Sequence, residues 1–374
     1  MPTDPSLEAI PVDKARLVGS TLCTSGDVAL PRLYLLGQQK SGTTTIATAL
    51  FQSGVVPMVQ GQPAGNIPLY LRSMRANHSQ KLLAGNVKES NLLAGIAPRS
   101  CWEPSCLARA QKRWVHKLSP TFSDCASWQS TVLADMSTDT FPHADRATLL
   151  RSFYGEKASR RLMLVVIMRA PLQRFQSGFY WTYNPAHFGL PRGRNHAHNR
   201  TLGMELAMLR KALPPDFKTA TTHWARFAQD RRFDCWARSM YSLNWRPWLE
   251  QFHPDQFVAL PMKWALQDVG RATQLIANHF GIALRRQPHI MGTRRHEDRA
   301  DTLNPNRHPS MEEDAAETTN QDTLRWLAST FFDPDTVELA RMFSSAAIRG
   351  LVLGGANGTG LDQDNALRAL HSGW

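Results

Sequence analysis

The feature that most constrains the fold of this chain is an apolar run that ends in a turn rich in glycine, lysine and hydroxyl groups, LYLLGQQKSGTTTI at residues 33–46. Leu33 to Leu36 is short and apolar enough for a buried parallel strand, and Gly37 and Gly42 supply a tight turn before a helical pattern. A strand, turn and helix in this order aim several backbone N–H groups and the positive end of the helix dipole at one point. The sequence therefore predicts an anion site at the start of this helix.

The turn also offers side-chain donors to that anion. The residues predicted to hold it are Lys40, Ser41, Gly42, Thr43, Thr44 and Thr45. The nearest familiar pattern is the nucleotide-triphosphate loop G-x-x-x-x-G-K-[ST], in which a lysine follows the second glycine. Here Gly37 and Gly42 have the right interval, but Thr43 occupies the lysine position and the lysine stands inside the loop at position 40. A turn of this composition without a ligand is the alternative interpretation.

A second apolar run, at residues 162–168, ends at Arg169 and is followed by APLQRFQSGFY. Seven apolar residues bounded by charge are typical of a central strand, and Pro171 suits the first turn of a helix. Arg169 is therefore expected at the carboxyl end of a strand. Arg174 and Ser177 are three residues apart on the helix and are expected to face the same way. A guanidinium fork with a hydroxyl group suits a phosphate monoester.

Both segments resemble the nucleotide motifs of sulfotransferases that use 3′-phosphoadenosine 5′-phosphosulfate (PAPS). Residues 40–45, KSGTTT, resemble the loop that binds the 5′-phosphosulfate. The R-x-P-x-x-R-x-x-S spacing from Arg169 to Ser177 resembles the 3′-phosphate signature. The motif order is closest to that of the carbohydrate sulfotransferases of the heparan sulfate and chondroitin type. The resemblance implies an α/β protein with a three-layer, P-loop-like fold, a central parallel sheet flanked by helices, PAPS as co-substrate and no metal.

The resemblance also indicates residues on the acceptor side. Sulfuryl transfer requires removal of the acceptor's proton, and a carboxylate near a cation can accept it. The Lys88-Glu89 pair resembles the position of the catalytic glutamate in glycan sulfotransferases, so Glu89 is the predicted base, with Lys88 and Asp135 as acceptor contacts. His116 is the rival base, because cytosolic sulfotransferases of small molecules use a histidine.

Two further nucleotide contacts follow from the same resemblance. Tyr241 matches a tyrosine on the family's helix beside the nucleotide, and it precedes a short apolar strand. Arg307 lies in a polar segment, residues 284–322, where glycan sulfotransferases have a basic loop that covers the nucleotide. Residues 292–296, GTRRH, are an equal candidate for that loop.

Composition limits the partners of this chain. Lys and Arg total 43 against 31 Asp and Glu, a net charge of +12, which favours anionic ligands. No basic helix, zinc-ligand spacing or aromatic-basic RNA signature is present, so nucleic acid is not expected as a partner. No window of 18 apolar residues occurs, so we expect no transmembrane segment and a soluble chain, with the Golgi lumen and the cytoplasm both open.

The predicted organisation is an N-terminal extension at 1–30, a sulfotransferase domain at 31–345 and a loose C-terminal tail at 346–374. The cysteine count of five forbids complete internal pairing. Cys101 and Cys106 are compatible with a small disulfide loop or with a reduced pair.

The sequence thus predicts transfer of the sulfuryl group of PAPS to a hydroxyl or amine of an acceptor, with a carbohydrate favoured. Two alternatives stay open at this point. One is a P-loop-type kinase, and the other is a non-catalytic protein that binds a nucleotide or a glycan.

Overall fold

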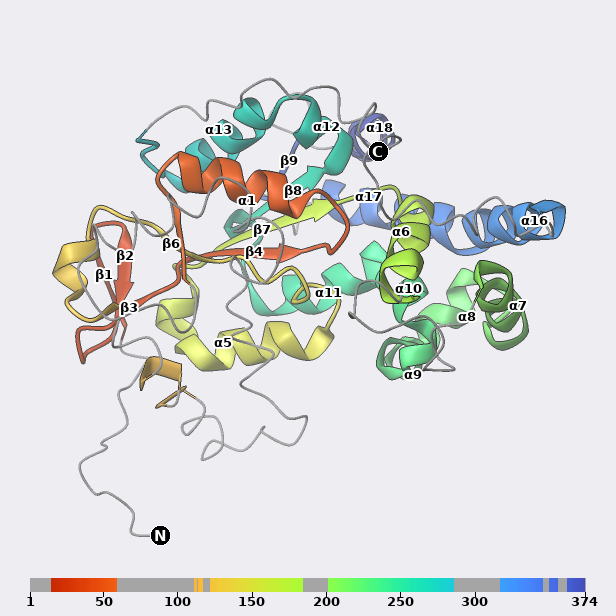
Figure 1. Cartoon of the computed structure of the whole chain (residues 1–374), viewed down its shortest axis with the longest axis horizontal. Helices are drawn as coiled ribbons and strands as arrows, with labels where there is room; N and C mark the ends of the chain where they lie inside the picture. Colours follow the sequence, from red (N-terminus) through yellow and green to blue (C-terminus); the bar gives the residue numbers. More distant parts are fainter. Residues whose placement is uncertain are drawn as a thin grey trace, which may run out of the picture.

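A six-stranded parallel sheet with strand order β5-β6-β4-β7-β8-β9 forms the centre of the computed structural model (Figure 1). The structure describes residues 15–58, 111–112, 114–116, 122–183, 201–285, 317–345, 350–355 and 362–373. The strands are β4 (Leu33–Gly37), β5 (Val56–Pro57), β6 (Leu133–Asp135), β7 (Met163–Met168), β8 (Phe257–Pro261) and β9 (Val352–Leu353). Every residue of β4, β7 and β8 is buried, as expected for parallel strands covered on both faces.

Helices cover both faces of the sheet, which makes three layers. Alternate residues of β4 belong to different apolar clusters: Leu33 and Leu35 to one, Tyr34 and Leu36 to the other. The helices of the first face are α1 (Thr43–Gln52), α12 (Met262–Gln267) and α13 (Val269–Phe280). Those of the second face are α5 (Ala144–Ser159), α11 (Tyr241–Gln251), α17 (Asp333–Ser344) and α18 (Gln363–Ser372). The predicted central parallel sheet flanked by helices is therefore confirmed.

A further group of helices lies to one side of the sheet and has its own apolar cluster, on the right in Figure 1. These helices are α6 (Pro171–Tyr183), α7 (Leu202–Ala212), α8 (Phe217–Thr222), α9 (Trp224–Gln229), α10 (Asp234–Ala237) and α16 (Glu317–Leu327). Short helical turns at Cys125–Trp128, Arg231–Phe233, Pro254–Gln256 and Ala328–Phe332 complete the described elements. Helix α16 starts inside the polar segment that we expected to be a loop up to residue 322.

The start of the described chain packs on the core through a small antiparallel sheet. Its strands are β1 (Arg16–Val18), β2 (Thr21–Cys23) and β3 (Ala29–Leu30), in the order β1-β2-β3. A disulfide joins the buried residues Cys23 and Cys125, whose Cα atoms are 6.0 Å apart. Residues 15–30 thus belong to the packed body, where we predicted an extension. The cysteines singled out in the sequence, Cys101 and Cys106, lie outside the described residues.

The end of the chain differs from the predicted loose tail. Strand β9 pairs with β8 and adds the sixth strand to the sheet. Helix α18 packs against α17 and buries Ala366, Ala369 and Leu370, which share one helical face. We did not predict strand β9 and helix α18, because the sequence between them is rich in glycine. Among the described residues, no helix is both long and apolar enough to span a bilayer.

Candidate functional site

The two predicted anion-binding segments meet at the carboxyl ends of β4 and β7, which are neighbours in the sheet. Strand β4 leads through residues 38–42 into α1, and β7 leads through Arg169 into α6, whose first residue is Pro171. Both strand-to-helix units lie where the sequence predicted them. Arg169 Nη1 donates a hydrogen bond to the Lys40 carbonyl oxygen at 3.3 Å, and Gln38 N donates to Ile167 O at 2.8 Å. Segments about 130 residues apart in sequence therefore form one site.

The turn between β4 and α1 brings the start of the helix to the carboxyl edge of the sheet. Lys40 and Gly42 adopt left-handed backbone conformations, with φ of 70° and 75°. Gly42 is the N-cap of α1, where no side chain caps the helix and no acidic residue occupies the first turn. The first amides of a helix have no intrahelical acceptor and attract anions. The geometry thus matches the predicted phosphate cradle.

Two cationic side chains, those of Lys40 and Arg169, lie close together at this turn. Burial lowers the pKa of the Lys40 ammonium, and the nearby charges of Arg169 and Arg174 lower it further. Burial also lowers the pKa of the Arg169 guanidinium. Within the described part of the chain, no carboxylate forms an ion pair with Lys40 or Arg169. Lys40 Nζ instead lies 4.2 Å from the centroid of the Trp181 ring on α6. A bound anion would relieve this repulsion.

An unsatisfied donor supports the same conclusion. Arg169 Nε is buried and has no hydrogen-bond partner among the described residues. Buried polar groups are normally paired, so each exception calls for an explanation. Phosphate and sulfate oxygens accept hydrogen bonds from guanidinium groups, so an anionic ester fits this donor. The site residues therefore suit a phosphosulfate nucleotide.

Arg174 has a partner in the core, and its predicted convergence with Ser177 on a phosphate stays a prediction. The Arg174 side chain is only 1% exposed, and its Nη1 donates to the Cys235 carbonyl oxygen of α10 at 2.9 Å. Helix α6 buries positions 171, 174, 175, 178 and 179, so Arg174 lies on its core face. It joins α6 to α10. Ser177 is half-buried on the flank of that face and stays a predicted phosphate contact.

Tyr241 contacts the backbone just after β7, where Arg169 begins the second half of the site. Its ring is fully buried, and its hydroxyl accepts a hydrogen bond from Arg169 N at 3.0 Å. Tyr241 starts α11, and the next amide, Ser242 N, donates to both carboxylate oxygens of Asp335 at 3.1 and 3.2 Å. Burial raises the pKa of Asp335 to about 7, although these hydrogen bonds act in the opposite direction. Asp335 was not predicted, because an Asp in the first turn of a helix is an ordinary sequence feature.

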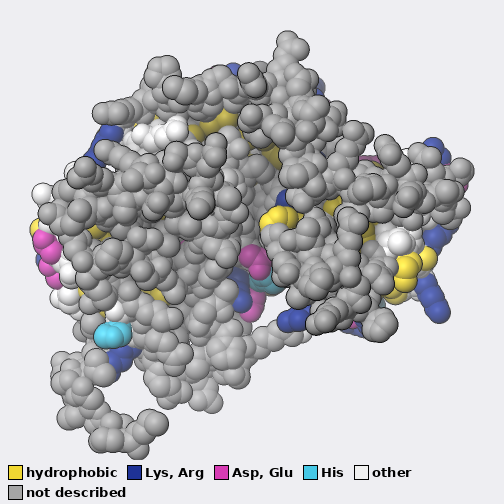
Figure 2. Space-filling model, viewed as in Figure 1, with side chains coloured by type: hydrophobic (Ala, Val, Ile, Leu, Met, Phe, Trp, Pro, Cys, Tyr) yellow, Lys and Arg dark blue, Asp and Glu magenta, His cyan; other side chains and the backbone are white. Residues whose placement is uncertain are grey.

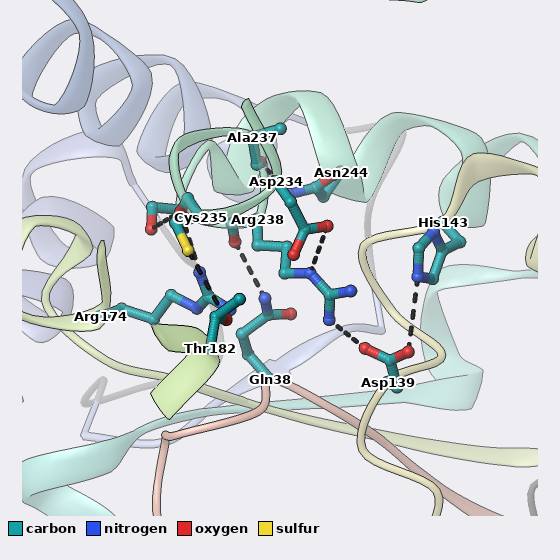
Figure 3. A network of polar contacts seen from close by, with 11 residues as sticks. Gln38, Asp139, His143, Arg174, Thr182, Asp234, Cys235, Ala237, Arg238 and Asn244 are labelled. Carbon is teal, nitrogen blue, oxygen red and sulfur yellow. Dashed lines mark hydrogen bonds and ion pairs between the residues drawn. The ribbon is translucent and has the colours of Figure 1, made fainter. Parts of the chain in front are cut away.

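A charged network extends from the turn toward β6 (Figure 3). Gln38 Nε2 donates to the Arg238 carbonyl oxygen at 3.1 Å, and Arg238 Nε donates to Asp234 Oδ1 at 2.8 Å. The same guanidinium pairs with Asp139, which also faces His143. Burial alone would lower the pKa of Arg238, but the two carboxylates outweigh it and raise the pKa. Sequence reasoning missed this network, because its members come from separate segments.

The remaining predicted residues are placed as follows. Asp135 ends β6 and is buried, and its Oδ1 accepts a hydrogen bond from Ser137 N at 2.9 Å. This contact caps the following turn, and a role of Asp135 toward an acceptor stays a prediction. His116 is exposed in a short helical segment. Lys88, Glu89 and Arg307 lie outside the described residues.

Comparison with known proteins adds little. No family model and no curated protein matches the sequence. The solved structures that are similar to this chain include a sulfotransferase from Alicyclobacillus acidocaldarius, with a TM-score of 0.45 and 12% sequence identity over 84% of this chain and 96% of that chain. Similarity at this level assigns neither a family nor an activity.

Proposed function

We propose that this chain is a PAPS-dependent sulfotransferase that sulfates a hydroxyl or amine of an acceptor, with a carbohydrate as the acceptor class. The contact between Arg169 and the Lys40 carbonyl carries the proposal, because it joins the two motifs into one anion site. The order of these motifs supports sulfuryl rather than simple phosphate chemistry.

In this proposal the nucleotide lies across the carboxyl edge of the sheet, as ligands do in open α/β sheets. Residues 40–45 hold the 5′-phosphosulfate, while Arg169 and Ser177 hold the 3′-phosphate. Tyr241 fixes the backbone of Arg169, and Arg307 contributes from the predicted covering loop. Each charged end of the nucleotide then has its own set of donors.

The chemistry is an in-line displacement at sulfur. The acceptor oxygen or nitrogen forms a bond to sulfur while the bond from sulfur to the 5′-phosphate oxygen breaks. Lys40 and the amides at the start of α1 stabilise charge on the departing oxygen, and such preorganised donors usually provide the largest catalytic contribution. Glu89 is the proton acceptor predicted from sequence, with Lys88 and Asp135 beside the acceptor.

The charge of the chain supports an acidic glycan as acceptor. The excess of 12 positive charges attracts polyanions at long range. A kinase is disfavoured, because Thr43 occupies the position at which the triphosphate loop requires its lysine.

The direct test is transfer of label from sulfur-35 PAPS to a panel of glycans, aliphatic alcohols and amines. We expect transfer by the wild-type protein and a loss of about a hundredfold or more in Lys40→Met. Lys157→Met, which removes an exposed lysine in the last turn of α5, before the amino end of β7, is the matched control and keeps full activity. Binding of magnesium ATP without affinity for adenosine 3′,5′-bisphosphate would favour a kinase. Tight binding of the bisphosphate without transfer to any acceptor would favour a non-catalytic binding protein.

A further inference from the structure

The loop after β6 lies beside the turn that forms the anion site. Strand β6 pairs with β4, and Phe141 N donates to Leu36 O at 2.9 Å. A Cβ atom on Gly37 would stand 2.6 Å from the carbonyl oxygen of Thr138. Asp139 follows Thr138 directly. Its backbone therefore lies beside the turn that leads to Lys40.

Arg238 fixes the position of the Asp139 carboxylate. Its guanidinium pairs with Oδ1 of Asp139, and its carbonyl accepts the hydrogen bond from Gln38, the first residue after β4 (Figure 3). The Arg238 side chain is 12% exposed and is also held by Asp234. Burial would raise the pKa of Asp139, but His143 and Arg238 outweigh burial and lower it. Asp139 therefore carries a negative charge at neutral pH.

His143 faces the second oxygen of this carboxylate. Its Nε2 lies 3.7 Å from Asp139 Oδ2, and the His143 and Asp139 side chains are 32% and 47% exposed. His143 precedes α5, which starts without a side-chain cap, so the helix amides do not occupy the other ring nitrogen, Nδ1. Figure 2 shows acidic, histidine and basic side chains together in the hollow between the sheet and helices α6 to α10. The pair is thus accessible to a second substrate.

We propose that His143, oriented by Asp139, is the general base that takes the proton of the acceptor, an inference that rests on the proposed function. The acceptor oxygen forms its bond to sulfur, and its proton moves to Nδ1 of His143. The bond between sulfur and the 5′-phosphate oxygen breaks, and its electron pair stays on adenosine 3′,5′-bisphosphate. Asp139 keeps its charge and stabilises the imidazolium.

Two features favour the imidazole over the neighbouring carboxylate as the base. Both oxygens of Asp139 are engaged, one by Arg238 and the other by His143. Asp139 is also a weak base, since its pKa is lowered. Asp139 on its own loop faces His143, and Arg238, which Asp234 also holds, pairs with that carboxylate. This pair takes the role that the sequence assigned to Glu89.

The test uses sulfur-35 PAPS with phenols of graded acidity as acceptors, and with water, measured as released sulfate. A general base contributes about 10²- to 10⁴-fold, so His143→Gln should lower kcat at least about a hundredfold for the least acidic phenol. The loss should shrink as the phenol becomes more acidic, because an acceptor that ionises readily needs less help from a base. Asp139→Asn should lower kcat less, by about tenfold. The affinity for adenosine 3′,5′-bisphosphate should stay within about twofold of wild type, which also shows that the variants fold.

His253→Gln is the matched control. His253 Nδ1 pairs with Asp255 Oδ1 at 2.6 Å, and this second histidine-carboxylate pair lies at the opposite, amino end of β8. Its removal should leave kcat unchanged for every acceptor.

Three results would overturn the inference. The first is His143→Gln with wild-type kcat, and the second is an equal loss for all phenols, which indicates a structural role. The third is Glu89→Gln showing the acidity-dependent loss while His143→Gln does not. Wild-type protein that binds the bisphosphate but transfers sulfate to none of the glycans, alcohols, amines and phenols, nor to water, would refute the proposed function itself. A wild-type protein that does not bind the bisphosphate would refute the site.

Discussion

Asp335 should make the stability of the protein depend on pH. Its carboxylate is fully buried at the start of α11, where Ser242 N donates to both of its oxygens. Burial raises its pKa from the ordinary value of 3.8 to about 7. A pKa that is higher in the folded than in the unfolded state gives stability at low pH that is lost as pH rises through the folded value. The protein should therefore lose stability between about pH 4 and about pH 7.

The size of this effect follows from the shift. About three pKa units at about 1.4 kcal/mol each give a total of about 4 kcal/mol. Integration of the two titrations places about 3 kcal/mol of it between about pH 5 and about pH 8. Asp335→Asn has no proton to lose and lacks this dependence. The free energy of unfolding of Asp335→Asn minus that of wild type should thus rise by about 3 kcal/mol across this range.

Urea unfolding of both proteins at about pH 5 and about pH 8 measures this double difference. All other titrating groups are common to the two proteins, so their contributions cancel. Asp333→Asn is the control, because Asp333 is an exposed carboxylate on the same helix. A difference between Asp335→Asn and wild type that stays constant within about 1 kcal/mol would refute the assigned ionisation of Asp335.

Three further predictions concern the site and its frame. Arg169→Ala should weaken binding of adenosine 3′,5′-bisphosphate about tenfold to a hundredfold, since it removes charge-assisted hydrogen bonds, and calorimetry showing unchanged affinity would contradict the phosphate role. Loss of the Cys23–Cys125 disulfide, which spans 102 residues, should lower the free energy of unfolding by about 4 to 5 kcal/mol from loop entropy. Equal urea midpoints for the oxidised protein and a Cys23→Ser, Cys125→Ser variant would count against the bond. Gly37→Ala should destabilise the protein by about 2 kcal/mol or more, because φ is 140° and the new Cβ would lie 2.6 Å from Thr138 O. A Gly37→Ala variant that unfolds at the same temperature as the wild-type protein would contradict this packing.

Local signals explain what the sequence predicted well. The apolar run before Gly37 and the run before Arg169 each form a strand followed by a helix, because their breakers and periodicity act within a few residues. The neighbouring positions of these strands were not predicted, since no local pattern specifies sheet order. The two strand-to-helix units were therefore predictable, and binding of a nucleotide by Lys40 and Arg169 stays a prediction.

The missed features depend on contacts between distant segments. The contact of Arg174 Nη1 with the Cys235 carbonyl oxygen of α10 was missed, because the two residues are 61 positions apart. The disulfide of Cys23 and the carboxylate of Asp335 have partners about 90 to 100 residues away. Strand β9 contains two residues, too few to form a pattern. Such features appear only when the chain is folded.

The most direct measurement is a crystal structure with adenosine 3′,5′-bisphosphate bound. We predict the 5′-phosphate on the amides and side chains of residues 40–45, and the 3′-phosphate within hydrogen-bond distance of Arg169 and Ser177. Nucleotide bound away from the carboxyl ends of β4 and β7, or with Arg169 still unpaired beside it, would contradict the assignment of this site.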